Sequence, residues 1–241
     1  AAAAAVVALI LVGALLLISR PLTPRLPRLG SFLVIGDWGW DSGSHGNVNS
    51  AKCQQAIAEK MLITMNGLGD VKFVINVGDS FYPDGVKSKD DPQWDVKWRN
   101  IYPQQLRSVP WYSVYGNHDY HQDPCICTND ESQCAQVNAN ATALDSFFMP
   151  GPNWNKDHPE LNLEVVGLDL NKFMEGWNRD LPLDELHFND CQWTSCSHAC
   201  LGIAEQRARE AFDLFGRRLE QSTRANLLVF SHYPTDYFTA K

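Results

Sequence analysis

Five polar side chains follow apolar segments of the chain close to the points where those segments end. Gly36, Gly78 and Gly116 each close one such segment, and a fourth segment ends at Phe230. The side chains that come within two residues of these ends are Asp37, Asp79, Asn117, His118 and His232. Any one of these stretches could be an ordinary turn, because Gly and Asp are common turn formers. The recurrence of the pattern after four separate segments is what indicates a shared site.

The donor types in this set suit a pair of transition-metal ions. Carboxylate, amide and imidazole groups are present, and Tyr82, three residues after Asp79, adds a phenolate. Asp79 is the natural bridge between two ions, because one carboxylate has two oxygens. Two ions about 3.5–4 Å apart can hold a hydroxide nucleophile and clamp a phosphoryl group during in-line displacement. His118, which follows Asn117, is predicted to protonate the leaving alkoxide as a general acid.

Alternating strands and helices must position these side chains. Short apolar runs predict strands at residues 31–35, 72–77, 111–115, 161–170 and 226–230. Helical spacing of apolar residues predicts helices at 48–68, 91–102 and 202–223, and residues 120–160 and 171–200 are expected to be irregular. The alternation indicates an α/β fold, in which the carboxyl ends of the strands deliver their polar residues to one edge.

Composition and charge exclude two classes of protein. The chain of 241 residues is 20% charged and contains 26 aromatic residues, which argues against intrinsic disorder. Its formal net charge is -8, and no basic stripe is present. A nucleic-acid-binding surface is therefore not expected. A phosphorylated small substrate remains compatible with this charge, because bound metal ions can invert the local field.

Seven cysteines bear on the cellular compartment. Six of them fall in two clusters of three within polar, turn-rich stretches, at 125–134 and 191–200. Disulfides in an oxidising compartment are the favoured interpretation, with a zinc cluster as the alternative, although neither cluster has paired C-x-x-C spacing. Cys53 lies in a helical pattern and is predicted to be a free buried thiol. A glycosylation sequon at Asn140 adds weak support for a luminal or extracellular domain.

The first residues form an apolar segment that is set apart from the rest. No charged residue occurs between Ala1 and Ile18, so residues 1–19 are interpreted as a signal peptide or membrane anchor, with a buried core helix as the alternative. Residues 20–30 form a Pro/Arg linker. Its arginines would lie in the cytoplasm by the positive-inside rule, which conflicts with the luminal placement indicated by the cysteines.

The ordered motifs resemble those of the calcineurin-like metallophosphoesterases. They are Asp37-x-Gly39, Gly78-Asp79-x-x-Tyr82, Gly116-Asn117-His118-Asp119 and Val229-x-x-His232. Two features narrow the resemblance to the purple acid phosphatases of the small, tartrate-resistant type. Gly39 stands where other members of the superfamily have a histidine, and Tyr82 follows the bridging aspartate. The resemblance covers approximately residues 31–119 and 201–236 and leaves out the cysteine-bearing loops.

The resemblance implies a fold, a metal centre and a reaction. The fold is an α/β, metallophosphoesterase-type β-sandwich of two mixed sheets flanked by helices, with the site at the carboxyl ends of strands. The centre pairs Fe(III) with a divalent Fe, Zn or Mn ion. The implied ferric ligands are Asp37, Asp79 and Tyr82, the divalent-ion ligands are Asp79, Asn117 and His232, and the outer-sphere acid is His118. The implied activity is an acid phosphatase that hydrolyses phosphate monoesters by direct attack of a metal-bound hydroxide.

The sequence departs from the family pattern in two places. Ser231 replaces the glycine before the last-motif histidine, with little consequence for ligation. A Gly-His-x-His motif, which gives each metal a further histidine, is absent between His232 and Lys241, and we expect it downstream. Residues 31–241 are therefore interpreted as a metallophosphoesterase domain truncated at its C-terminus. The remaining histidines are expected in surface loops, namely His45, His121, His158, His187 and His198. For His45 and His121, which are close in sequence to the site motifs, lining of the pocket is the alternative.

Two other functions fit the same residues. A phosphodiesterase or nucleotide pyrophosphatase would keep the fold and differ in the loops at 120–160 and 171–200. A non-catalytic, phosphatase-like binding domain is the alternative from another class, motivated by the missing histidine motif. The leading prediction is a metal-dependent phosphatase of the secretory pathway, either extracellular, lysosomal or vacuolar, or membrane-anchored on the luminal side. It would act on a small phosphorylated substrate and contact a membrane only through its apolar N-terminal segment; the sequence identifies no protein partner.

Overall fold

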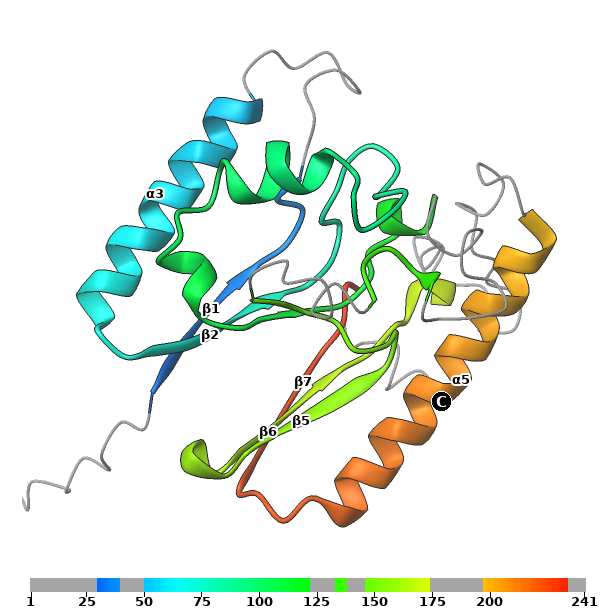
Figure 1. The fold of residues 1–241 in the computed structure, drawn as a ribbon. Coiled ribbons are helices and arrows are strands. Elements are labelled where there is room, and N and C mark those ends of the chain that lie inside the picture. Colours follow the sequence, from blue (N-terminus) through cyan, green and yellow to red (C-terminus); the bar gives the residue numbers. More distant parts are fainter. Residues whose placement is uncertain (1–29, 40–49, 122–132, 138–145, 174–196, 234–241) are drawn as a thin grey trace, which may run out of the picture.

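Two β-sheets face each other, and a long helix covers the outer face of each (Figure 1). The computed structural model describes residues 30–39, 50–121, 133–137, 146–173 and 197–233. The apolar segment, nearly all of the linker, the sequon and four of the clustered cysteines lie outside these ranges. In the part of the chain that is described, no helix is both long and apolar enough to cross a membrane.

The first sheet carries most of the predicted site. Its four strands run parallel in the order β1-β2-β3-β4. Their bounds are β1 Ser31–Ile35, β2 Val71–Asn76, β3 Trp111–Ser113 and β4 Phe147–Phe148. Because the strands are parallel, the loops that follow β1, β2 and β3 leave the sheet at the same edge.

The second sheet has three strands in the order β5-β6-β7. Their bounds are β5 Trp154–His158, β6 Leu163–Gly167 and β7 Asn226–Phe230. β5 is antiparallel to β6, whereas β7 is parallel to it, so this sheet is mixed. A 3-10 turn, η6 (Pro159–Leu161), joins β5 to β6 and leads into Asn162, whose left-handed φ of 50° completes the reversal.

Apolar side chains fill the space between the sheets and beneath both helices. Phe73 and Tyr112 from the first sheet pack against Trp154 and Phe230 from the second. On the first sheet's outer side, α3 (Ser50–Leu68) contributes Ala58 and Met65, and on the second sheet's, α5 (Ser197–Gln221) contributes Ala208 and Ala211. Gly69 has a φ of 70° and ends α3 with an N–H donated to the Met65 carbonyl, a position that glycine adopts without strain.

Short helical turns complete the architecture and hold the site loops. They are the π-helix η1 (Trp94–Arg99) and the 3-10 turns η2 (Leu106–Ser108), η3 (His118–His121) and η7 (Asn171–Phe173). The helix predicted at 91–102 is present only over its middle part, as the wider π-helix η1. Trp94 and Trp98 of η1 are fully buried and pack with Trp111 and Phe147 in an aromatic cluster under the site edge.

The α/β sandwich is confirmed, but only its second sheet is mixed, because the described strands of the first sheet are all parallel. The other principal errors fall where strand residues are polar. Residues 120–160 were expected to be irregular, yet β4 and β5 lie there. β5 has the sequence Trp-Asn-Lys-Asp-His, whose polar middle is exposed, and only its pairing with β6 makes it a strand. Cys53 is a free thiol as predicted, but it is exposed rather than buried, because it borders an open hollow between α3 and β1.

Candidate metal centre

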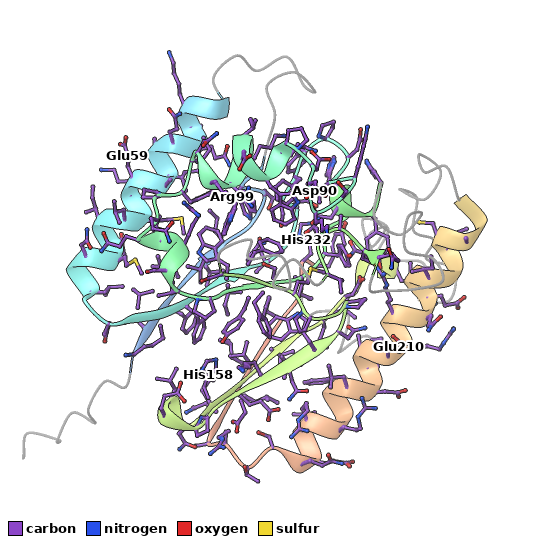
Figure 2. The ribbon with its side chains drawn as sticks, viewed as in Figure 1. Glu59, Asp90, Arg99, His158, Glu210 and His232 are labelled. Carbon is purple, nitrogen blue, oxygen red and sulfur yellow. The ribbon has the colours of Figure 1, made fainter. Side chains whose placement is uncertain are left out.

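The predicted site residues come together where the loops after β1, β2 and β3 meet the end of β7. His232, beyond β7, lies near the middle of the molecule (Figure 2), and its ring contacts the Val77 carbonyl just after β2. Asp79 and Tyr82 are buried, Asn117, His118 and His232 are half-buried, and Asp37 is exposed. The centre therefore has one open side, formed around Asp37.

Both aspartates that follow glycine have the same unusual backbone. Asp37 has a φ of 56° and Asp79 a φ of 53°, the left-handed region that side chains other than glycine seldom adopt. Asp37 donates its N–H to the Gly78 carbonyl at 3.1 Å, which ties the two turns together. Strain of this kind is concentrated at functional sites, where it aims side chains that regular structure would not.

Asp79 lies between two groups of donors. Its Oδ2 accepts a hydrogen bond from the Tyr82 hydroxyl at 2.5 Å. Its Oδ1 accepts the backbone N–H of His118 at 3.0 Å and lies 3.7 Å from His232 Nε2. Each oxygen of this carboxylate thus faces a different set of side chains, which is the arrangement expected of a residue that bridges two ions.

Tyr82 joins the two carboxylates on one side of Asp79. Its hydroxyl also lies 2.9 Å from Asp37 Oδ1, so three oxygen-bearing side chains gather at this point. Burial, and then the charges of Asp79 and Asp37, raise the pKa of Tyr82 far above its ordinary value. A phenol in this position stays protonated unless a cation takes the place of its proton, and this donor set fits a hard, highly charged ion.

His232 and Asn117 lie on the other side of Asp79. His232 Nδ1 is 2.8 Å from the Val77 carbonyl, so Nδ1 carries the hydrogen and Nε2 faces the centre. Nε2 lies 3.2 Å from Asn117 Oδ1, which also accepts the Tyr233 hydroxyl at 2.9 Å. A histidine held through Nδ1 by a backbone carbonyl is the usual orientation of a metal-ligating imidazole.

The carboxylate and imidazole ligands do not form a metal site by themselves. In the described ranges, no group of three or more His, Cys, Asp or Glu side chains is arranged to hold a metal ion. Three of the five predicted ligands, Asp37, Asp79 and His232, are of these types, and the other two are a tyrosine and an asparagine. The fit to a metal pair therefore rests on the mixed oxygen and nitrogen donors around Asp79.

His118, predicted as a general acid, stands beside the centre. Its Nδ1 lies 2.7 Å from the Pro83 carbonyl, and its ring packs on Tyr82 with centroids 4.2 Å apart. With Nδ1 donating to a carbonyl, Nε2 is the nitrogen that can exchange a proton with a substrate.

Residues 30–236 match the calcineurin-like phosphoesterase family. The chain belongs to this family. Purple acid phosphatase 3 of Arabidopsis thaliana is 44% identical over 160 residues, 63% of this chain and 39% of that protein. Purple acid phosphatase 7 of the same plant is 43% identical over 107 residues, 44% and 28% of the two chains. Human tartrate-resistant acid phosphatase type 5 is 33% identical over 113 residues, 44% and 33% of the two. The matches thus span between 28% and 39% of these relatives' lengths.

Gly39 has no room for the histidine that other superfamily members carry. A Cβ at Gly39 would lie 1.9 Å from the Ser80 carbonyl oxygen and 2.9 Å from the Phe81 Cα. The loop after β1 therefore rests directly on the backbone that leads to Tyr82. Gly39 and Tyr82, which were singled out separately in the sequence, belong to one packing arrangement.

Two buried polar residues that hold the loops of the candidate centre had no role assigned from the sequence. Asp119 accepts N–H groups from Ser80 at 3.1 Å and Gly116 at 2.9 Å, and the Gln136 amide at 2.8 Å. Asn76, at the end of β2, accepts the Trp38 indole N–H at 2.9 Å and donates to the hydroxyls of Ser80 and Ser113. The Gly-Asn-His-Asp motif was the available signal for Asp119, whereas Asn76 reads as one polar residue in an apolar strand.

Two of the histidines expected in surface loops lie elsewhere. His121 is in η3, its side chain is 13% exposed, and its ring centroid is 5.2 Å from that of His118. His158 ends β5 and lies between the Tyr112 hydroxyl and Glu160. Those surface predictions are wrong because each ring packs against an aromatic neighbour. His198 is in α5, and His45 and His187 fall outside the described residues.

Proposed function

We propose that this protein is an acid phosphatase of the purple type, which hydrolyses phosphate monoesters at a dinuclear centre of Fe(III) and a divalent Fe, Zn or Mn ion. The observation that carries the proposal is the position of Asp79 between Tyr82 with Asp37 and His232 with Asn117. The purple acid phosphatase relatives support the same activity.

The chain's own residues would have distinct tasks in this reaction. When bound, the metal pair supplies the nucleophile for direct attack on phosphorus and neutralises the phosphoryl charge. Asp37, Asp79 and Tyr82 would hold the ferric ion, and Asp79, Asn117 and His232 the divalent one. His118 would donate the proton of its Nε2 to the leaving alkoxide, with the Pro83 carbonyl fixing the ring through Nδ1.

The test is the visible absorption of the purified protein together with its metal content. A tyrosinate-to-iron transition is expected in the wild type and is lost in Tyr82→Phe. Tyr112→Phe is the matched control, because Tyr112 is a buried tyrosine bonded to His158, outside the centre, and the colour should survive there. A colourless but iron-loaded and active wild type would contradict the phenolate assignment.

Turnover of an aryl phosphate monoester and of the corresponding diester separates the proposed reaction from the phosphodiesterase alternative. We expect the monoester to be preferred. A preference for the diester would keep the centre and change the substrate class, and no turnover of either by an iron-loaded protein would support the binding-domain alternative.

We further propose that the protein works in the secretory pathway and that its six clustered cysteines are paired in disulfides, at least one of which joins the two clusters. The support is the clustering itself and the complete or near-complete burial of Cys134 and Cys200, one from each cluster. Peptide mapping without reduction should find the six clustered cysteines paired and Cys53 available to a thiol reagent. Labelling of all seven in the native protein would contradict the proposal.

A further inference from the structure

Lys97 is a buried cation whose ammonium contacts the loops of the candidate centre. Its side chain is 8% exposed, and it lies in η1 between the fully buried Trp94 and Trp98. Its ammonium donates a hydrogen bond to the Gly39 carbonyl at 2.9 Å and a second, short one to the Tyr82 carbonyl. On the backbone side, the Lys97 carbonyl accepts the Gln54 amide of α3 at 2.9 Å.

The two acceptors belong to the two loops that supply predicted ferric ligands. Gly39 is two residues after Asp37, and Tyr82 is itself a predicted ligand. The Gly39 carbonyl also accepts the Tyr82 N–H at 3.2 Å, so one carbonyl oxygen receives both the backbone of Tyr82 and the ammonium of Lys97. The ammonium thus closes a small ring of polar contacts that sets the Tyr82 backbone relative to the Asp37 turn.

The chemistry of a buried ammonium argues for a specific task. Removing a lysine from water is costly, and only well-placed oxygen acceptors offset that cost. An apolar residue of similar length would pack at this position without that cost. The ammonium instead donates its hydrogen bonds to the backbone of the two ligand loops.

We propose that Lys97 is a positioning residue for the phenolate ligand, holding the backbone of Tyr82 against the Gly39 turn so that the Tyr82 hydroxyl meets Asp37 and Asp79. This inference rests on the proposed function, since it concerns the same centre. Lys97 does not contact substrate or metal in this role; it acts through Tyr82.

The experiment compares the wild type with Lys97→Met and Gln54→Met. Lys97→Met keeps the length of the stem and removes the ammonium. Gln54→Met removes a buried side-chain hydrogen bond to η1 itself and leaves the ammonium contacts in place. Four quantities are measured. They are the visible band and kcat, both per bound iron, KM, and the rate of hydrogen exchange of the Tyr82 N–H in the metal-free protein.

The proposal expects a shifted and weaker band in Lys97→Met, with kcat lowered by about ten- to a hundredfold and KM little changed, as for a small misplacement of a catalytic group. Exchange of the Tyr82 N–H should accelerate in that variant and stay near the wild-type rate in Gln54→Met. If Lys97→Met does not fold, Lys97→Gln, which keeps an amide donor, is measured in its place.

Two results would overturn the inference in distinguishable ways. In the first, the wild type is coloured, and the Lys97 variant keeps its band, its kcat and its Tyr82 exchange rate. If only its thermal stability is lowered, as in Gln54→Met, Lys97 is a structural residue. A wild type that binds no iron removes the proposed function and this inference with it.

Discussion

Two buried carboxylates, Asp119 in the 3-10 turn η3 and Asp169 bonded to it, have different kinds of partner. Asp119 lies within η3 and is caged by N–H groups from the loops after β2 and β3. Asp169, beyond β6, accepts the hydroxyl of Tyr120, the next residue of η3, and lies 3.5 Å from the Arg207 guanidinium of α5. One carboxylate gathers neutral backbone donors from nearby loops, and the other is paired with a full positive charge from a distant helix.

This difference suggests that the two carboxylates serve different parts of the structure, the loops of the metal centre and the sandwich as a whole. Burial, and then the charge of Asp79, raises the pKa of Asp119 to about 7, so its environment does little to favour a charge there. Arg207 places its guanidinium 5.1 and 5.3 Å from the ring centroids of Tyr115 and Tyr120, and the pair with Asp169 links α5 to η3. We expect the Asp169 cluster to matter most for global stability and the Asp119 cluster for the metal centre.

The largest effect is expected from Arg207→Met. The substitution leaves the Asp169 charge buried without its cation, which should lower the free energy of unfolding by about 3–5 kcal/mol. Urea denaturation measures it. Arg209→Met, on the exposed side of the same helix, is the control and should change stability by no more than about 0.5 kcal/mol. Equal losses in the two variants would show that the buried pair contributes nothing beyond an exposed one.

An intermediate effect is expected from Asp119→Asn. The amide keeps one acceptor oxygen but turns an NH2 group toward backbone donors, a loss of about 1–3 kcal/mol. Removal of the repulsion with Asp79 offsets part of this. Bound metal should be removed by a chelator much more readily than in the wild type, although the free energy of unfolding falls only by this small amount. The reason is that the loops carrying Asp79 and Asn117 lose their common anchor. Asp95→Asn, at an exposed pair with Arg99, is the control; unchanged chelator resistance in Asp119→Asn would contradict the comparison.

The smallest effect is expected from Tyr120→Phe. Asp169 keeps Arg207 and the Asn171 amide, and the ring under the guanidinium remains, so one hydrogen bond worth about 1 kcal/mol is lost. The same substitution in the Arg207→Met background should cost measurably more or less than in the wild type, because the two residues share one acceptor. Additive losses, from chemical denaturation of all three variants, would mean that the hydroxyl and the guanidinium act independently.

The places of the predicted ligands in the fold follow from local rules. Asp37, Asp79 and Asn117 follow parallel strands, and the carboxyl ends of parallel strands share an edge whatever the details of packing. His232 follows β7, whose bounds match the prediction at both ends. Such side chains can be placed together from strand order alone.

The remaining features depend on contacts that no local pattern records. Lys97 reads as the solvent face of a helix, and its burial follows from η1 packing across the loops. β5 becomes a strand through β6, and His121 is covered because η3 turns it toward His118. For Cys53 the error is the reverse, because a residue predicted to be buried is exposed. Helical spacing marks a face as apolar without showing that another element covers it.

His232 is the one predicted ligand that the second sheet supplies, and its Nδ1 is held by the Val77 carbonyl at the end of β2. Cation binding at this centre and packing of the two sheets are therefore thermodynamically linked. Any ion bound by Asp79 and His232 together would stabilise the sandwich by mass action, and a chelator would loosen the contact between the sheets before it exposed either one. By the same linkage, a cavity made in the packing of Phe73 and Trp154 between the sheets should weaken the binding of metal.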